Sequence, residues 1–289
     1  MRERQAGEHL PGVTMLGPLA PVRPERELWA AERAGEPLVL RVIANRHVAA
    51  GEPWRTTMLA ALARRGYPVA ERLWHGWLDS ASYGIVERRV PGWPLAAMSS
   101  ETLDRLLALV DLQAGADIDL EGGFDVSRWL ALVLFEGWEG WWDAARGGSR
   151  AGAAVCERLA PLLAPVQGLE LETSDFVHHD LNLSNVLAVG GRITGVVDWE
   201  GGGFGSRAVD LGCLLFEWER LRLAGAPDLP PDGADRILAR FEAAGGEAAL
   251  RLAVAYRAVS VMGVTASRDR RWFDVWTRTA AAVLSRLGV

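Results

Sequence analysis

The first third of the chain contains several short runs of apolar residues. Residues 26–33 alternate weakly between apolar and polar positions and are followed by the turn-forming sequence Ala-Gly-Glu. Residues 37–44 (PLVLRVIA) form a continuous apolar run that only Arg41 interrupts, and residues 83–90 (YGIVERRV) form another, stopped by Pro-Gly. Such runs, bounded by turn residues, are typical of strands. We therefore predict three strands here, the second of them buried.

Helical spacing appears at residues 54–65 and dominates the chain after Pro91. Residues 54–65 place their methionine and leucines on one predicted face, and Gly66 ends the helix. Ser127 is a plausible N-cap of a long helix further on. The helices predicted after Pro91 cover residues 101–112, 128–146, 151–163 and 269–287, with two or three more before the last one.

These patterns predict an α+β protein with two lobes, a small β-rich N-terminal lobe and a larger, mostly α-helical C-terminal lobe. We place the boundary at Pro91-Gly92, so that the lobes are residues 1–90 and 91–289. The chain has 289 residues, of which 49% are hydrophobic and 24% charged. That length is long for one compact domain and sufficient for two lobes that share one cleft.

The balance of charge excludes some classes of function. The formal net charge is −6, and no run of arginines forms the concentrated basic face that a phosphate backbone requires, so nucleic acid is not an expected partner. The sequence contains no lysine. A Walker-type P-loop needs a lysine at its phosphate cradle, so that class of nucleotide-binding protein is excluded.

The remaining composition predicts a location. Cys156 and Cys213 lie in apolar, helical-looking segments and form no C-x-x-C pair, so we expect buried free thiols, not a disulfide or a zinc site. Residues 1–9 are charged and polar, unlike a signal peptide, and no uncharged apolar stretch is long enough to span a bilayer. We expect a cytoplasmic protein with no membrane partner.

The segment 176–212 carries the candidate chemistry. It contains the spaced set H-x-D-x-x-x-x-N as His178, Asp180 and Asn185. Two predicted strands, residues 185–189 and 192–197, flank Gly190-Gly191, a hairpin turn signal, and the second strand leads into Asp198. A further acid, Asp210, begins the next predicted helix.

Phosphoryl transfer explains why these residue types occur together. The reaction needs an oriented nucleophile and cations on the developing phosphate charge, and little covalent help. Asp180 can accept the proton of an incoming hydroxyl group. The amide oxygen of Asn185 and the carboxylate of Asp198 suit Mg²⁺, which prefers oxygen ligands. The hairpin is expected to bring Asp198 back beside Asn185.

The same residues resemble the motifs of the aminoglycoside phosphotransferase and choline kinase family, which is related to the protein kinases. The family pattern reads H-x-D-x-x-x-x-N, then a D-W/F-E-type triplet, then D-L, and this chain has all three in order. The resemblance implies a protein-kinase-like fold and transfer of a phosphoryl group from ATP or GTP to a small substrate that bears a hydroxyl group and can be cationic. It also implies Asp180 as catalytic base, Asn185 and Asp198 as Mg²⁺ ligands, Asp210 as an anchor of the catalytic loop, and His178 as a residue that orients it.

The resemblance extends to three positions that would bind the nucleotide. Arg41 stands where the family carries the lysine that touches the α- and β-phosphates, and arginine can make a bidentate phosphate contact. Arg88 and Val90 fall on the expected lobe connector, where the family hydrogen-bonds adenine through backbone groups. Residues 12–26 depart from the family, because they are proline-rich and contain no Gly-rich phosphate loop.

A second departure leaves an alternative function open. The helix expected to offer a glutamate to Arg41 has Arg55 near that place, and Glu52 lies a turn early. The alternative is a pseudokinase, a binding or scaffold protein with the same fold and little or no transferase activity. A true protein kinase is disfavoured, because His-His-Asp replaces H-R-D and no A-P-E segment follows Asp198 before Asp210.

Two smaller questions stay open. His178 and His179 could be metal ligands, but no further ligand has zinc spacing. The tryptophans of residues 138–142, interspersed with acids, could bind a cationic amine or could pack inward, and packing is favoured.

The acceptor is undetermined among aminoglycosides, macrolides, choline, homoserine and sugar alcohols. A polyamine sugar would require acids on the helical lobe to meet its ammonium groups.

Overall fold

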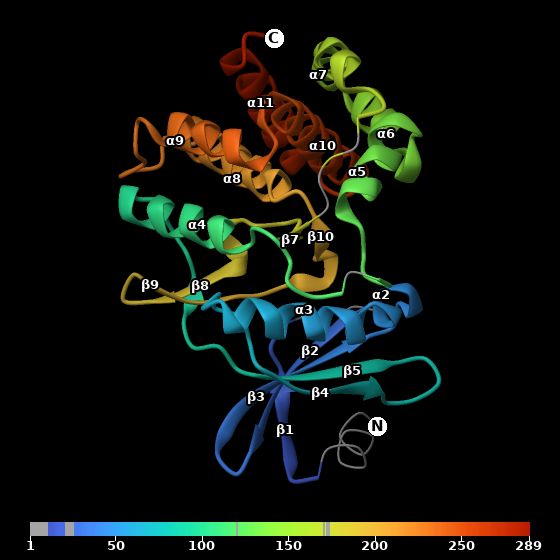
Figure 1. The fold of residues 1–289 in the computed structure, drawn as a ribbon, viewed down its shortest axis with the longest axis vertical. Coiled ribbons are helices and arrows are strands. Elements are labelled where there is room, and N and C mark those ends of the chain that lie inside the picture. Colours follow the sequence, from blue (N-terminus) through green and yellow to red (C-terminus); the bar gives the residue numbers. More distant parts are fainter. Residues whose placement is uncertain (1–10, 21–25, 120, 170, 172–173) are drawn as a thin grey trace. The chain divides into compact units, whose positions relative to one another are not determined.

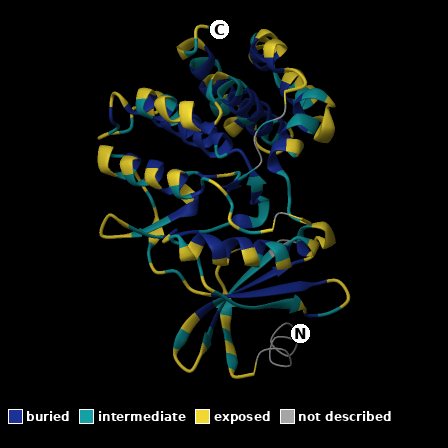
Figure 2. Ribbon diagram, viewed as in Figure 1, coloured by how far each residue is buried: buried dark blue, intermediate teal, exposed yellow. Residues whose placement is uncertain are grey.

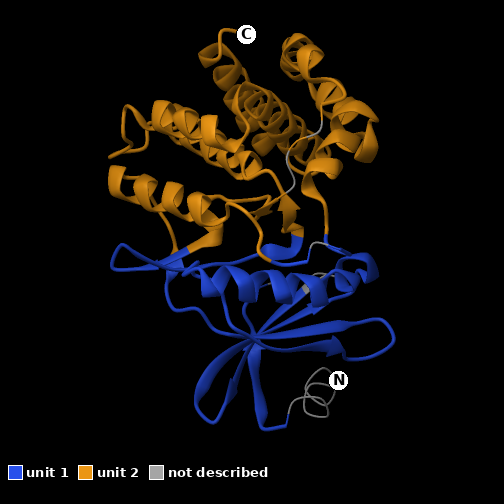
Figure 3. Ribbon diagram, in the orientation of Figure 1, with its two compact units in different colours: residues 1–93, 118–123, 187–200 blue, residues 94–117, 124–186, 201–289 orange. Residues whose placement is uncertain are grey.

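The computed structural model describes residues 11–20, 26–119, 121–169, 171 and 174–289. The chain forms two compact units (Figure 3). Unit 1 comprises residues 1–93, 118–123 and 187–200, and unit 2 comprises residues 94–117, 124–186 and 201–289. The first division falls after residue 93, three residues beyond the predicted division after residue 90. Unlike the two continuous lobes that we expected, unit 1 also takes in two later segments.

Unit 1 is built on a five-stranded antiparallel sheet with strand order β1-β2-β3-β5-β4 (Figure 1). The three predicted strands are confirmed, and the pattern of apolar residues had not indicated the two outer strands, β1 and β4. The strands are β1 Val13–Pro18, β2 Arg26–Arg33, β3 Glu36–Ile43, β4 Arg72–Trp77 and β5 Tyr83–Arg88.

Both faces of β3 are covered, which explains its unbroken run of apolar residues. On one face, Leu38, Leu40 and Val42 belong to a buried hydrophobic cluster. On the other face, Ile43 packs with Ile85 of β5 in a second cluster. Because side chains alternate along a strand, Arg41 shares the face of Ile43. The one charged residue of the run is therefore held inside the unit.

Helices α2 Arg46–Ala50 and α3 Glu52–Arg64 also belong to unit 1. Helix α3 lies against β4, where the guanidinium of Arg72 donates a hydrogen bond to Thr56 Oγ1 at 3.0 Å. The hairpin predicted around Gly190-Gly191 is confirmed as β8 Val186–Val189 and β9 Arg192–Val196. Strand β8 lies between β9 and β6 Trp93–Pro94 in this three-stranded sheet.

Gly92 is required by its surroundings. Its φ is +117°, a backbone conformation that L side chains rarely adopt, and a Cβ atom there would lie 2.6 Å from the carbonyl oxygen of Ala188. The Pro91-Gly92 turn signal therefore corresponds to a place where the chain runs against the β8 backbone.

Unit 2 is mostly helical, with a small two-stranded sheet of β7 Asp175–Val177 and β10 Gly203–Gly205. Four of the predicted helices are confirmed within a residue or two: 101–112, 151–163, 269–287 and the one that begins near Asp210. The helices of unit 2 are α4 Ser100–Leu112, α5 Val126–Phe135, α6 Trp141–Gly148, α7 Arg150–Leu163, α8 Ala208–Leu223, α9 Gly233–Arg240, α10 Gly246–Ala266 and α11 Arg270–Arg286.

The prediction of one long helix over residues 128–146 is wrong. Asp125, not Ser127, is the N-cap, since its carboxylate accepts from the Arg128 N–H at 2.8 Å. The helix then stops at Phe135, because Gly137 adopts φ +71° and ends it in the left-handed region. Gly140 repeats that conformation before α6 begins. Apolar spacing alone did not reveal these two glycine breaks.

Helices α8 and α10 are the most buried helices described in unit 2 (Figure 2). Helix α10, Gly246–Ala266, is long and apolar enough to cross a membrane by length and composition, but 72% of that stretch is buried inside the protein. It contacts α6, α8 and α11. These contacts identify α10 as the central helix of a packed unit.

Candidate active site

The backbone of the loop after β7 is held by one buried carboxylate. Asp210, in the first turn of α8, accepts hydrogen bonds from the His178 N–H at 2.7 Å and the His179 N–H at 2.8 Å. Gln113, at the end of α4, donates to the same carboxylate at 2.9 Å. Asp210 and Gln113 are both fully buried. These contacts show that Asp210 anchors the backbone of this loop, as the resemblance implied.

His178 orients the next residues of the loop. Its ring is buried, and its Nδ1 accepts the Asp180 N–H at 3.3 Å. His179 between them has φ +76°, an uncommon conformation for a residue with a side chain. The hydrogen bonds that the His178 and His179 N–H groups donate to Asp210 hold that conformation. The ring of His178 thus supports the backbone of the loop, as the resemblance implied.

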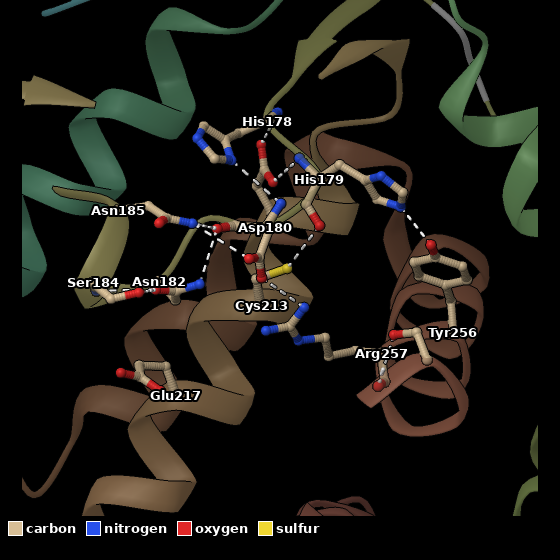
Figure 4. Close-up of polar contacts among 12 residues, drawn as sticks. His178, His179, Asp180, Asn182, Ser184, Asn185, Cys213, Glu217, Tyr256 and Arg257 are labelled. Atoms are coloured by element: carbon tan, nitrogen blue, oxygen red, sulfur yellow. Dashed lines mark hydrogen bonds and ion pairs between the residues drawn. The ribbon is translucent and has the colours of Figure 1, made fainter. Parts of the chain in front are cut away.

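Asp180 presents its carboxylate at the surface of unit 2, where side chains from two directions hold it (Figure 4). Arg257 of α10 donates from Nη1 to Asp180 Oδ1 at 3.0 Å. The Asn185 amide lies 3.3 Å from Oδ2. The Asp180 side chain is 53% exposed, whereas that of Arg257 is 11% exposed. A fixed and accessible carboxylate of this kind can take a proton from a bound hydroxyl group.

Sequence reasoning missed Arg257. The only signal was an arginine within the apolar stretch that became α10, and such a residue usually has an anionic partner. Its neighbour Tyr256 was missed as well. The Tyr256 hydroxyl pairs with His179 Nε2, and the two rings stack with centroids 5.3 Å apart.

His179 is neutral at physiological pH, because burial lowers its pKa to about 4. Beneath the same loop, the Cys213 thiol contacts the carbonyl oxygen of His179 at 3.6 Å. Burial raises the pKa of the Cys213 thiol to about 12, so it stays protonated. The predicted buried free thiols at Cys156 and Cys213 are confirmed.

The lowered pKa of His179 predicts acid sensitivity. The unfolded chain binds a proton near the ordinary pKa of 6.5, and the folded protein binds it only near 4, so stability falls as pH drops through that window. Between about pH 7.5 and about pH 5, the wild type should lose roughly 1–2 kcal/mol more unfolding free energy than His179→Gln. Urea unfolding of both proteins at both pH values measures this difference. Equal losses would contradict a neutral, buried His179.

Asn185 lies at the end of the short helical turn Leu183–Asn185. Its amide nitrogen donates to the Asp180 carbonyl oxygen at 2.9 Å, which fixes the amide so that the oxygen atom remains as the ligand. The donor type therefore fits Mg²⁺. Among the described residues, no group of three or more His, Cys, Asp or Glu side chains could hold a metal ion.

Asp198 belongs to unit 1, where it follows β9. Its φ is +70°, a strained conformation for aspartate and one that is often found at functional sites. The Asp198 carboxylate acts electrostatically on Arg41, which also lies in unit 1. Burial tends to lower the pKa of Arg41, but Glu87, Glu200 and Asp198 together raise it above the ordinary value.

Arg41 is buried and has acidic neighbours on two sides. Its Nη2 lies 3.3 Å from Glu87 Oε2, and its Nη1 lies 3.5 Å from Glu200 Oε1. Its Nε and Nη1 groups have no hydrogen-bond partner in the described part of the chain. A buried guanidinium whose Nε and Nη1 make no hydrogen bond, with only a 3.5 Å ion pair to Glu200 at Nη1, suits a phosphate oxygen. The carboxylates beside Arg41 come from Glu87 of β5 and from Glu200, and not from α3, in line with the departure from the family pattern noted in the sequence.

Glu52 of α3 instead joins a second set of charges. It pairs with Arg55 on its own helix and, at 2.6 Å, with Arg72 of β4. Arg72 in turn donates to Glu87 at 3.0 Å, and Glu87 pairs with Arg41. Glutamates and arginines therefore alternate in a buried network from α3 to β3.

Arg88 and Val90 occupy different surroundings. The Arg88 N–H donates to the Glu71 carbonyl oxygen at 2.9 Å. The Arg88 side chain pairs with Glu36 and Glu71 at the surface. Val90 packs against Gly195, since a Cβ atom added to Gly195 would lie 2.5 Å from Val90 Cγ1. Contact with adenine stays a prediction for both residues.

The proline-rich segment 12–26 is described only in part. Strand β1 covers Val13–Pro18 and pairs with β2, so a strand begins this segment. Pro21 and Pro24 lie outside the described residues. The predicted absence of a Gly-rich phosphate loop therefore stays a prediction.

A pocket of about 380 Å³ opens beside Asp180 within unit 2. The loop residues His179, Asp180 and Asn182 form one side of it, and α10 and α11 form much of the rest. Among the tryptophans of residues 138–142, which could bind a cationic amine or pack inward, Trp141 lines the pocket. The Trp142 ring instead donates a hydrogen bond to the Leu134 carbonyl oxygen at 3.2 Å. The Asp180 carboxylate is therefore open to this pocket.

Solved structures of related shape identify the class of fold. An aminoglycoside phosphotransferase, APH(4)-Ia in its apo form, matches with a TM-score of 0.73 at 19% identity, over 99% of each chain. The choline kinase LicA from Streptococcus pneumoniae matches with a TM-score of 0.64 at 13% identity, over 99% of this chain and 98% of that one. This chain therefore has the protein-kinase-like fold of these enzymes, as the motifs implied.

The family follows from the sequence. The profile of the phosphotransferase enzyme family matches residues 25–259, which is most of the chain. The chain belongs to this family. No curated protein matches it. A putative aminoglycoside phosphotransferase from Ralstonia eutropha is a further structural match, with a TM-score of 0.62 at 17% identity over 97% of both chains.

Proposed function

We propose that this protein is an ATP- and Mg²⁺-dependent phosphotransferase that acts on a hydroxyl group of a small molecule, an antibiotic or a metabolite. The observation that carries the proposal is the fixed Asp180 carboxylate, held by Arg257 and facing a pocket of unit 2. Family membership supports phosphoryl transfer. A structural neighbour was solved with AMP-PNP and hygromycin B, which supports a nucleotide donor and a small acceptor. GTP is an alternative donor, and a cytoplasmic location stays a prediction.

In the proposed reaction, the hydroxyl oxygen of the acceptor forms a bond to the γ-phosphorus of the nucleotide. The bond from that phosphorus to the bridging oxygen breaks, and the nucleoside diphosphate leaves with the electron pair. The hydroxyl proton passes to Asp180, whose orientation Arg257 and Asn185 maintain. Arg41 supplies N–H donors and positive charge to the phosphates.

Asn185 and Asp198 are the residues that would hold Mg²⁺. Bound there, the ion would neutralise charge on the phosphate oxygens. Glu200 has a different role in this proposal: it pairs with Arg41 and keeps the guanidinium in place.

A screen of hydroxyl compounds for stimulated ADP release tests this function. Stimulation should require Mg²⁺, and Asp198→Asn should raise the Mg²⁺ concentration needed for half-maximal release by about tenfold or more, because a carboxylate ligand is lost. An unchanged Mg²⁺ titration would remove Asp198 from the ligand set.

The pseudokinase alternative has one supporting observation. Arg41 is already held by Glu87 and Glu200, so a phosphate must compete with carboxylates for it. Calorimetry of ATP binding with and without Mg²⁺ separates the two functions. Mg²⁺-dependent binding together with stimulated ADP release supports the enzyme, and binding with no release from any acceptor supports the scaffold.

A further inference from the structure

The pocket beside Asp180 has aromatic and aliphatic walls. Trp141, Tyr256 and Trp276 contribute rings, and Val261 and Val264 of α10 contribute apolar surface. Three elements supply these side chains: α6, α10 and α11. A surface of this kind favours an apolar body, at about 25 cal/mol for each Å² that leaves water.

The charges in the pocket cancel. Among the described residues that line it, Asp180 is the one carboxylate and Arg257 the one guanidinium, and they are paired at 3.0 Å. Arg257 also lies over the Trp276 ring, 5.8 Å from its centroid. His179 adds no charge, since its pKa is about 4. A cationic ligand would therefore find one acid, already neutralised by a buried arginine.

Other acids near the pocket are not placed to receive ammonium groups. Glu217 of α8 is buried, and Arg220 binds both of its carboxylate oxygens at 2.8 Å. The acids that we considered for cation binding, Glu136, Glu139 and Asp143, are exposed and do not line the pocket. The acids that a polyamine sugar would require are thus absent from the described lining.

A cationic acceptor and an uncharged acceptor differ in the free energy of binding to such a surface. An ammonium group that leaves water without a free carboxylate loses its hydration, and a cation–π contact with the rings offsets only part of that cost. A neutral aromatic or aliphatic group gains from burial against the rings and pays no such cost. Ser260 and Thr265 also line the pocket; their hydroxyl groups donate to carbonyl oxygens of α10, so their oxygen atoms can accept a hydrogen bond from a ligand hydroxyl group.

We propose that the acceptor bound beside Asp180 is an uncharged hydroxyl compound with an aromatic or aliphatic body, not a polycationic aminoglycoside. This substrate class rests on the proposed function for its chemistry, but its recognition by the pocket can be measured as binding alone.

The test compares ligands of opposite character on the full chain. Chloramphenicol and 2-phenylethanol are uncharged aromatic alcohols, and hygromycin B is an aminoglycoside with protonated amines. Quenching of tryptophan fluorescence and calorimetry should show binding of at least one uncharged probe with Kd of about 1 mM or tighter, and hygromycin B should bind at least tenfold more weakly. Binding of the uncharged probe should change little with added salt, because no ion pair forms.

A pair of tryptophan variants locates the binding. Trp276 lines the pocket, whereas Trp272, one turn earlier on α11, does not, and the two rings stack with centroids 6.0 Å apart. Trp276→Ala should weaken binding of the uncharged probe about tenfold, and the matched control Trp272→Ala should change it less than about twofold. Equal effects of the two variants would overturn the assignment of this pocket.

The outcomes also separate this inference from the function on which it rests. Tighter binding of hygromycin B than of both uncharged probes overturns the substrate class, and the proposed function survives if hygromycin B also stimulates ADP release. Failure of both uncharged probes to bind overturns the substrate class as well. Binding of an uncharged probe at Trp276, with no ADP release from any acceptor, supports the pocket assignment and counts against the proposed function.

Discussion

Asp180→Asn is expected to lower kcat for the acceptor that the screen identifies by about 10²–10⁴-fold, because an amide cannot take the hydroxyl proton. The substitution keeps the size of the side chain, and Arg257 retains an oxygen atom to bind. The KM for ATP should therefore change little, and the melting temperature should stay close to that of the wild type. Steady-state kinetics and thermal unfolding measure these effects.

Asp111→Asn is the matched control for this substitution. Asp111 is also an aspartate of unit 2 whose side chain pairs with an arginine, Arg240, and it is 49% exposed against 53% for Asp180. Its replacement should leave kcat within about twofold, since exposed ion pairs contribute little. Retention of wild-type turnover by Asp180→Asn would remove Asp180 from the mechanism.

Glu52→Ala is expected to lower the free energy of unfolding by about 3–5 kcal/mol, the largest stability effect that we predict. The Glu52 side chain is fully buried and pairs with Arg55 and Arg72, whose side chains are 5% and 3% exposed. Without the glutamate, two buried guanidinium groups lose their shared partner. Urea unfolding at neutral pH measures the loss, provided that the variant folds.

Glu71→Ala tests whether burial of the glutamate causes the large loss of unfolding free energy expected for Glu52→Ala. Glu71 also pairs with an arginine in unit 1, Arg88, but its side chain is 62% exposed. Its removal should cost less than about 1 kcal/mol. If Glu52→Ala does not fold, Glu52→Gln keeps the volume and should still unfold at lower urea than Glu71→Ala. Equal stability of the Glu52 and Glu71 variants would show that the buried network contributes no special stability.

The local elements were predictable where the pattern was strong. Strand β3 followed from a run of apolar residues, and the β8–β9 hairpin followed from Gly190-Gly191, both of which adopt positive φ. The helix over residues 128–146 was not predictable from apolar spacing, because Gly137 and Gly140 interrupt it without changing that spacing. A break that depends on backbone conformation leaves little trace in hydrophobic periodicity.

The candidate site was predictable where its residues lie close in sequence. The spacing of His178, Asp180 and Asn185 indicated a catalytic loop, and the resemblance to the family implied that Asp210 anchors it. Their bonds to one another in unit 2 agree with that reading. Arg88 and Val90 show the limit of this reasoning, since their expected contact with adenine depends on a bound nucleotide and stays a prediction.

The sequence by itself determined the class of protein, since the order and spacing of the motif residues are properties of the chain. Only the tertiary structure decided which charges meet. Arg257 is 77 residues from Asp180, and Arg41 takes its carboxylate from β5 and not from α3. Such pairs depend on how helices and strands pack, and burial then determines their strength, so no local pattern could have revealed them.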